Sequence, residues 1–522
     1  MTKSIYRKVG IASALMMASV LLSRVIGLFR EVVIAYTGGA GASVDAYQVA
    51  FVIPEMLNHA VASGFLSVTF IPIFSRYLSQ NREEEGWRIF SFILNGFGGL
   101  LIILIAGAVV FAPRLVALIA PGLRDPQTVA GAVYMTRIVL PAQFFFFAGG
   151  MFMAVQFAKE RFFLPALAPL IYNLGIITGG VVLGPKIGMA GFSWGVLAGA
   201  FVGNFAIQYW GAMKIGFRYR VAFDFLHPDF KKYVLLTLPL MVGLTMTFST
   251  EFFLKFFGSY LPPGNIASLN YGLRVMLILV GFFGQAVGVA TFPFLARLSV
   301  EDRMDEMNRL LSTTLRYLSL VIPISALMIV LRNEVVMILF QRGRFDAAAT
   351  SLTAHVLLFL MIGAFAFSAQ TVVVRGYYAV QNTLFPALFG SAAVLLSIPL
   401  YIAGMTVMGV GGVALAISLS AILQVALLYV LWNRRSGNPE SRRVYIAYGR
   451  MMVLGIGLGL SMEWLRRTLF EPAAVASIWA NLATCLIMGG LFILAVSVAG
   501  YLFRINEITE FASRIISRRR KP

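Results

Sequence analysis

Cysteine, histidine and charged residues are all scarce in this chain. A single cysteine, Cys485, among 522 residues excludes an internal disulfide, and with only three histidines the chain offers no cluster of the usual metal ligands. No Walker-type phosphate loop occurs, so ATP is excluded as the direct energy source. Charged residues make up 12% of the chain and hydrophobic residues 59%, whereas soluble domains carry about 25% charged residues. The chain is therefore predicted to be an integral membrane protein.

Apolar stretches recur from one end of the chain to the other. Each is roughly 20 or more residues long, which is the length that an α-helix needs to cross a bilayer. We predict an all-α polytopic fold with about fourteen transmembrane helices. Most of the 42 lysines and arginines fall on the inner side if the N-terminus is inside, so both termini are predicted to be cytoplasmic. This bias explains the net charge of +20 without nucleic acid and predicts contact with anionic membrane lipids.

The chain also repeats itself at a constant offset of 221 residues. The matched pairs include Pro72 with Pro293, Arg76 with Arg297, Arg82 with Arg303, Glu85 with Glu306, and Gly188 with Gly409. Each copy contains six predicted spans, so both copies have the same orientation, as in the parallel repeats of many transporters. We predict an N-terminal lobe over 1–221 (spans 1–6) and a C-terminal lobe over 222–440 (spans 7–12), around a central cavity. Residues 441–522 add spans 13 and 14 and a basic cytoplasmic tail.

Several cations lie inside the predicted spans, where a charge at the centre costs roughly 2.5–3.5 kcal/mol. Arg24 and Arg30 fall in the first span and Arg274 in the eighth. A guanidinium group suits phosphate because it stays charged and donates two parallel hydrogen bonds. We therefore predict that these arginines line a polar cavity and bind an anionic group. The alternatives are ion pairs of Arg24 with Glu31 or of Arg30 with Asp45, or arginines that extend to the headgroups.

Other ionisable residues in the spans have plainer explanations. Asp45, at the start of span 2, is predicted to position an arginine or to cap the span, and it is retained as a candidate substrate contact. His59 is either a proton-responsive group, since imidazole titrates near neutrality, or a neutral hydrogen-bonded side chain. Glu251 and Lys255 are four residues apart on one helix face and are predicted to pair.

The motifs of the chain resemble those of one known family. The stretch SRVIGLFREVVIAYTGGAGASVDAYQVAFVIPEML (Ser23–Leu57) is similar to the N-terminal signature of the MurJ/MviN family of lipid II flippases. Further similar motifs are SGFLSVTFIPIFSRY (Ser63–Tyr77), LIAPGL (Leu118–Leu123), ILFQRGRFDA (Ile338–Ala347) and GYYAVQNTLFPAL (Gly376–Leu388). The family belongs to the multidrug/oligosaccharidyl-lipid/polysaccharide exporter superfamily and has a fourteen-span, two-lobe architecture.

The resemblance implies a function and a set of site residues. Family members move undecaprenyl-pyrophosphate-linked peptidoglycan precursor from the inner to the outer leaflet of the bacterial cytoplasmic membrane by alternating access. Arginines in spans 1 and 8 are functionally required in the family, and the matching positions here are Arg24, Arg30 and Arg274. The family's acidic residue before span 2 matches Asp45. The resemblance thus implies that cavity arginines hold the pyrophosphate of lipid II. It also implies association with cell-wall synthesis proteins.

The chain departs from the family pattern in three places. Where the family commonly has two adjacent arginines followed by a glutamate in span 2, this chain has Asn58, His59 and Ser63. After Arg274 the usual acidic residue and proline are missing, and in span 7 the acid associated with sodium binding in some members aligns with Leu254. We therefore assign accessory roles to Glu31, Asn58, His59 and Ser63.

The resulting prediction is a lipid II flippase, a transporter and not an enzyme, with no cofactor and with coupling to the membrane potential or a cation gradient. One alternative is an exporter of another polyprenyl-linked oligosaccharide or of a drug, although cationic drugs call for acids rather than arginines. Another is a membrane glycosyltransferase, for which the predicted outer loops are short, or a scaffold of envelope assembly.

Overall fold

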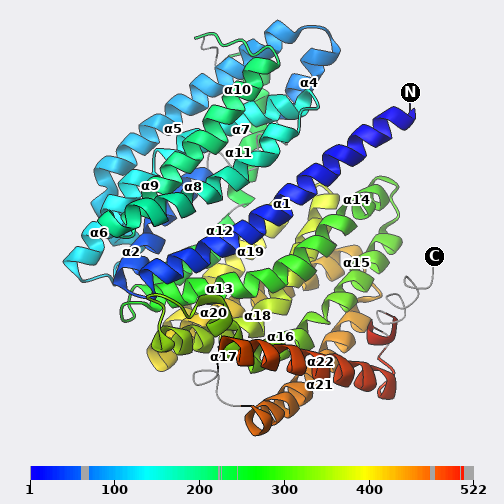
Figure 1. The fold of residues 1–522 in the computed structure, drawn as a ribbon. Helices are drawn as coiled ribbons and strands as arrows, with labels where there is room; N and C mark the ends of the chain where they lie inside the picture. Colours follow the sequence, from blue (N-terminus) through cyan, green and yellow to red (C-terminus); the bar gives the residue numbers. More distant parts are fainter. Residues whose placement is uncertain are drawn as a thin grey trace. The chain divides into compact units, whose positions relative to one another are not determined.

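The protein is built from α-helices joined by short connections (Figure 1). The computed structural model describes residues 2–59, 70–221, 224, 226–243, 245–470, 477–505 and 507–510, and it describes only the backbone of 2–13 and 236–247. No strand occurs within these ranges. The chain divides into two compact units, Met1–Ala267 and Ser268–Pro522. The predicted lobe boundary at residue 221 rests on the sequence repeat and stays a prediction.

The first unit contains the helices up to α12 and the first turn of α13. Their bounds are α1 Thr2–Gly38, α2 Ala42–Ala50, α3 Val52–Leu57, α4 Ile71–Ser79, α5 Glu83–Ile119, α6 Pro126–Val139, α7 Ala142–Ala158, α8 Phe163–Ile187, α9 Ala190–Gly199, the π-helix η3 Ala200–Ala206, α10 Ile207–Lys214, α11 Pro228–Gly243 and α12 Thr245–Gly258.

The second unit contains most of α13 and all later helices. Their bounds are α13 Asn265–Val280, the π-helix η4 Gly281–Gln285, α14 Ala286–Val300, α15 Met304–Leu318, α16 Val321–Val330, α17 Arg332–Phe340, α18 Ala347–Ala379, α19 Leu384–Leu396, α20 Ile398–Ser436, α21 Ser441–Leu469 and α22 Ile478–Leu502. Within α20, Gly409 has a positive φ of 56°, which breaks the helix into two straight parts.

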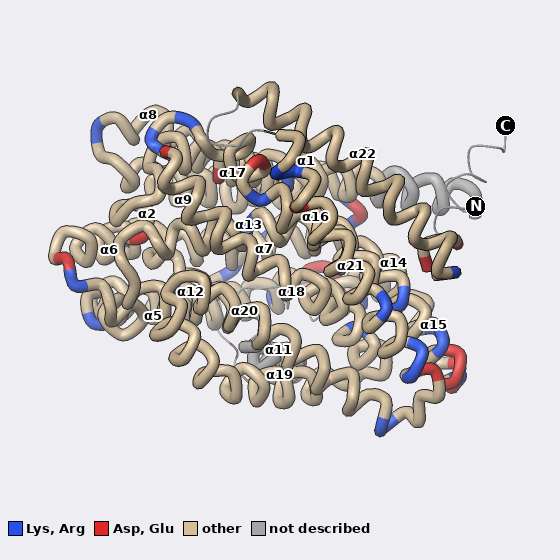
Figure 2. Tube along the Cα trace, turned by 90° about the horizontal axis from the view of Figure 1, so that it is seen from below, with Lys and Arg blue, Asp and Glu red and all other residues tan. Residues whose placement is uncertain are grey.

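Ten helical segments of the described chain are long and apolar enough to cross a membrane. They cover predicted spans 3–6 and 8–14, because the segment Leu384–Ser436 includes two of those spans. Predicted spans 1, 2 and 7 correspond to α1, to α2–α4 and to α11–α12. Charged residues gather at helix ends, for example near α15, while most of the trace carries none (Figure 2). The multi-span all-α fold is confirmed, and the count of about fourteen stays a prediction.

The offset of 221 residues reappears in the backbone. Four pairs of described residues at this offset share a positive φ: Asn81 and Asp302 (56° and 54°), Glu160 and Gln381 (57° each), Gly188 and Gly409 (60° and 56°), and Gly216 and Gly437 (86° and 61°). Asp125 and Asp346, also 221 apart, each accept a hydrogen bond from the backbone N–H three residues later and so cap α6 and α18. The two copies therefore share their turns and helix starts as well as their sequence pattern.

Helices α8 and α9 pack through glycines in contact. A Cβ built on Gly179 would lie 2.5 Å from the Cα of Gly195, and one built on Gly195 would lie 2.5 Å from the carbonyl oxygen of Gly175. Small residues spaced four apart allow two membrane helices to approach closely, so that van der Waals contact replaces the missing hydrophobic driving force. This contact holds together the two helices that support the first unit's polar interior.

We expect Gly179→Ala to lower the stability of the first unit by roughly 1–3 kcal/mol, since the new methyl group overlaps the backbone of α9. The measurement is the thermal unfolding midpoint of the purified protein, together with its abundance in the membrane. Gly184→Ala is the matched control on the same helix, because a Cβ there meets nothing within 4 Å. Equal loss of stability in both variants would show that helix propensity, and not the close contact, is responsible.

The last two helices pack on the second unit. Met462 of α21 and Met488 and Phe492 of α22 form an apolar cluster with Val330 and Leu331. Beside this cluster, Arg466 of α21 donates to Glu334 of α17 at 3.1 Å, and Glu334 is only 1% exposed. Since breaking a buried pair leaves an uncompensated charge, this contact fixes α21 against α17.

Candidate functional site

Arg30 of α1 is held in place by two side chains of the first unit. One terminal nitrogen of its guanidinium donates to Oε1 of Glu31 at 2.6 Å, and the other donates to Oδ1 of Asn173 on α8 at 3.1 Å. Glu31 is 3% exposed, and the side chain of Arg30 is 21% exposed. Nε of Arg30 and Oε2 of Glu31 are buried and have no hydrogen-bond partner among the described residues. Buried polar atoms without partners are rare in folded proteins and mark a place where a ligand or water belongs.

The other predicted arginines are placed differently. Arg24 lies on the same helix as Arg30 and is exposed. Arg274 lies in α13 within the second unit and is partly buried. The structure thus places Arg30 in a polar environment formed by Glu31 and Asn173. The roles of Arg24 and Arg274 in binding stay predictions.

Asp45 makes backbone contacts with both of its carboxylate oxygens. Oδ2 accepts a hydrogen bond from the N–H of Gly264 at 2.5 Å, and Oδ1 accepts one from Ala267 at 2.7 Å. The side chain is 2% exposed, and the two N–H donors that it binds lie at the start of α13. The sequence predicted an ion pair with Arg30 or a cap on span 2, whereas Asp45 binds the first turn of another helix. We interpret it as a positioning residue, because its oxygens are occupied and its charge would repel a phosphate.

This interpretation predicts that Asp45→Ala lowers the free energy of unfolding, while the transport rate of each folded molecule changes little. Hydrogen bonds to a charged group contribute about 1.5–3 kcal/mol each, and the variant loses two. The measurements are membrane abundance and thermal unfolding, with transport expressed per folded molecule. Asp125→Ala, which removes a less buried cap on α6, is the control and should lose only about 1 kcal/mol. A normally abundant Asp45→Ala protein without transport would instead support a substrate contact.

A second group of ionisable residues lies on α3 and α12 of the same unit. Lys255 is 1% exposed, and its ammonium lies 3.0 Å from Oε2 of Glu251 and 3.9 Å from Oε2 of Glu55. The predicted pairing of Glu251 with Lys255 is confirmed. His59 packs edge-on against Phe248 with ring centroids 5.7 Å apart, and Glu251 is close enough to interact with its imidazole electrostatically. The ammonium of Lys255 therefore lies within 4 Å of two carboxylates inside a largely apolar unit.

Two tyrosines connect these charged groups. Tyr47 of α2 and Tyr172 of α8 are both close enough to Arg30 and to Glu55 for electrostatic interaction. The polar side chains of α1, α2, α3, α8 and α12 therefore form one electrostatically connected region within the first unit.

The accessory predictions are tested only in part. Asn58 donates to Oε1 of Gln143 on α7 at 3.0 Å, so it joins two helices at the position where the family commonly has an arginine. Ser63 lies outside the described residues. Sequence reasoning missed Asn173, Gln143, Tyr47 and Tyr172. Asn173 and Gln143 could have been found in the sequence, because each is an amide side chain within a long apolar stretch.

The described residues contain no group of three or more histidine, cysteine, aspartate or glutamate side chains that could hold a metal ion. The polar region of the first unit contains guanidinium, ammonium, carboxylate, amide, imidazole and phenol groups. Of these, guanidinium and ammonium groups are the ones that attract an anion.

Comparison with known proteins assigns this arrangement to a family. A model of the family described as lipid II flippase MurJ matches residues 34–495. This chain belongs to the lipid II flippase MurJ family. MurJ proteins are multi-pass inner-membrane transporters rather than enzymes, and the apolar helices of the chain fit that class.

Two MurJ relatives and two solved structures show how far the similarity extends. A probable lipid II flippase MurJ of Vibrio cholerae is 27% identical over 496 residues, which cover 93% of each chain. The lipid II flippase MurJ of Burkholderia cenocepacia is 27% identical over 423 residues, or 80% of this chain and 82% of the relative. A solved lipid II flippase MurJ in an inward closed conformation superposes with a TM-score of 0.75 at 23% identity and covers 94% of this chain and 99% of that one. An inward-facing multidrug resistance MATE transporter shares the fold alone, with a TM-score of 0.62 at 14% identity over 80% of this chain and 94% of the other.

Proposed function

We propose that this chain moves lipid II from the inner to the outer leaflet of the bacterial cytoplasmic membrane by alternating access. Membership of the MurJ family supports this activity. The observation that supports the binding chemistry is the buried Nε of Arg30, which has no partner among the described residues although the rest of the guanidinium is fixed. In our proposal a pyrophosphate oxygen accepts from this edge of the guanidinium.

The fixed orientation of Arg30 matters for such a role. An arginine has five N–H donors, and Glu31 and Asn173 use donors of its two terminal nitrogens. The remaining donors are held in place before the ligand arrives, so little side-chain entropy is lost on binding. In this proposal Arg24 and Arg274 contribute further positive charge, with Arg24 acting from the same helix as Arg30.

We further propose that the membrane potential or a cation gradient drives turnover. The group of Lys255, Glu251 and Glu55 supports this, because it places ionisable side chains within the membrane part of the unit, where an electric field acts on them. A charge that moves through the membrane field gains about 2.3 kcal/mol per 100 mV. Collapsing the potential with an ionophore and removing sodium in separate experiments distinguish the two sources.

The decisive experiment is replacement of the resident flippase of a bacterium by this chain. We expect growth to be restored, and lipid II to become accessible on the outer face of the membrane. Failure to restore lipid II translocation by a normally abundant protein would contradict the proposal. Accumulation of a different polyprenyl-linked saccharide on the inner leaflet, after depletion of this chain in its own host, would identify that saccharide as the cargo.

A further inference from the structure

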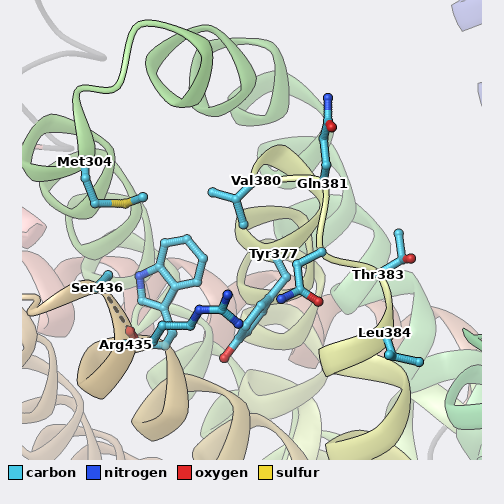
Figure 3. Close-up of a pocket in the computed structure, with 10 residues that line it drawn as sticks. Met304, Tyr377, Val380, Gln381, Thr383, Leu384, Arg435 and Ser436 are labelled. Atoms are coloured by element: carbon cyan, nitrogen blue, oxygen red, sulfur yellow. Dashed lines mark hydrogen bonds between the residues drawn. The ribbon is translucent and has the colours of Figure 1, made fainter.

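A cavity of about 490 Å³ lies in the second unit, where the ends of α18 and α20 meet the starts of α15 and α19 (Figure 3). Its wall combines the aromatic rings of Tyr377 and Trp432 with the guanidinium of Arg435 and the amides of Gln381 and Asn382. None of its ten lining residues is acidic. The cavity therefore presents a cation and amide donors without a carboxylate to balance them.

The aromatic wall is fixed by its own hydrogen bonds. Trp432 donates from Nε1 to Oδ1 of Asn308 at 2.9 Å, and the Tyr377 hydroxyl donates to the carbonyl of Leu428 at 2.9 Å. The two rings meet edge to face, with centroids 5.1 Å apart. Arg435 is exposed, its guanidinium lies 5.3 Å from the ring centre of Phe385, and it points toward Tyr377 in Figure 3. The guanidinium of Arg435 thus packs on an aromatic ring, and this contact does not use its N–H groups, which can donate to a ligand.

The repeat shows what occupies the same place in the first unit. At the offset of 221 residues, Met304, Val380, Arg435 and Ser436 correspond to Glu83, Lys159, Lys214 and Ile215. There, Lys159 forms an ion pair with Glu83 and donates to the carbonyl of Ile215 at 2.6 Å. Lys214, the counterpart of Arg435, lies 3.5 Å from the ring centre of Trp210. The first unit therefore supplies its own carboxylate at this position.

The second unit has lost that carboxylate and its lysine but has kept the cation on an aromatic support. A cavity lies beside Met304 and Val380, at the place where the first unit has the ion pair of Glu83 and Lys159. We propose that this cavity binds the phosphate-bearing headgroup of an anionic membrane lipid, which takes the place of the carboxylate of Glu83. The fork of Arg435 donates to the phosphate, since a guanidinium binds phosphate oxygens in parallel pairs.

The surroundings favour a lipid over a soluble anion. The cavity lies at the ends of two candidate membrane spans, Ala347–Ala379 and Leu384–Ser436, where tryptophan and tyrosine mark the membrane interface. Leu384, in the cavity wall, is 57% exposed and Leu388, one turn later, is 53% exposed, so an apolar surface for acyl chains adjoins the polar wall. The predicted orientation places these helix ends at the inner leaflet, which carries anionic lipid. Binding of a lipid at this site is measured without lipid II transport, so the test does not depend on that activity.

The test measures retention of phosphatidylglycerol by the purified full-length protein with native mass spectrometry. We expect Arg435→Gln and Met304→Glu to bind this lipid about tenfold more weakly, because one charge-assisted contact is lost or opposed. Met304→Glu restores the carboxylate found in the first unit and adds an acid to the first turn of α15, where it suits the helix dipole. Arg434→Gln is the matched control, since this exposed arginine is adjacent to Arg435 but does not line the cavity. Unfolding temperatures confirm that each variant is folded.

Three results would overturn the proposal. The first is equal retention of phosphatidylglycerol by Arg435→Gln, Met304→Glu and the unchanged protein. The second is equal retention of zwitterionic phosphatidylcholine, which would show that the negative charge is not recognised. The third is binding of inorganic phosphate that depends on Arg435 while lipid retention does not, which would assign the cavity to a soluble anion.

Discussion

Replacing Arg30 with alanine is expected to abolish rescue of a flippase-deficient bacterium and to lower lipid II translocation at least about 100-fold. Hydrogen bonds to charged groups contribute about 1.5–3 kcal/mol each, and in our proposal Arg30 makes at least one with the pyrophosphate and positions the rest of the site. The measurement is the fraction of lipid II that becomes accessible on the outer face per unit time, divided by the amount of protein in the membrane. Arg24→Ala and Arg274→Ala are expected to act in the same direction.

The Arg30→Ala variant alone is ambiguous, because it leaves the buried Glu31 without its ion-pair partner. Breaking such a pair costs about 3–5 kcal/mol, so the protein could be lost through misfolding. The double variant Arg30→Met/Glu31→Gln removes both charges at similar volume and should restore abundance while transport stays absent. Arg137→Ala on α6 is the control, since this exposed arginine donates to the carbonyl of Val109 and its loss should leave transport unchanged. Transport by the folded double variant would reduce Arg30 to a structural role.

Replacing Lys255 with methionine is expected to destabilise the first unit by about 3–5 kcal/mol. The variant keeps most of the side-chain volume but leaves Glu251 and Glu55 without the ammonium that lies between them. Little folded protein should remain in the membrane, and the thermal unfolding midpoint of what remains should fall. The cost comes from the two carboxylates that have lost the ammonium beside them.

The second variant in this experiment is Lys255→Met/Glu251→Gln, in which the closest carboxylate is neutralised as well. We expect it to recover most of the lost stability, because a neutral amide at this position no longer needs a cation. Lys186→Met, at an exposed site near the end of α8, tests the same chemical change outside the cluster and should leave stability unchanged. Equal stability of Lys255→Met and the unchanged protein would show that water solvates both carboxylates.

Local spacing predicted some of these contacts and missed others. Glu251 and Lys255 were predicted to pair because residues four apart on a helix face each other, and they do. Glu31 binds its neighbour Arg30, whereas the alternatives considered from sequence paired Glu31 with Arg24 and Arg30 with Asp45. Which rotamers meet depends on the neighbouring helix, here α8 with Asn173, and that helix is more than 140 residues away in sequence.

Asp45 shows the same limit more sharply. Its acidic chemistry and its place before span 2 were readable in the sequence, but its partners are the backbone N–H groups of Gly264 and Ala267. Backbone groups leave no pattern in a sequence. A contact between a side chain and the start of a distant helix is therefore invisible until the chain is folded.

By itself, the sequence determined the membrane class, the two related copies and the intramembrane arginines. Hydropathy, the asymmetry of positive charge between loops and the constant repeat offset can all be read from the sequence. The bilayer imposes the first two on any chain that crosses it, and duplication of a segment produces the third. Only the tertiary structure decided that Glu31 and Asn173 hold Arg30, that Asp45 caps α13, and that one copy carries a cavity where the other carries an ion pair. These features depend on which helices pack together, and packing brings together residues that the sequence keeps far apart.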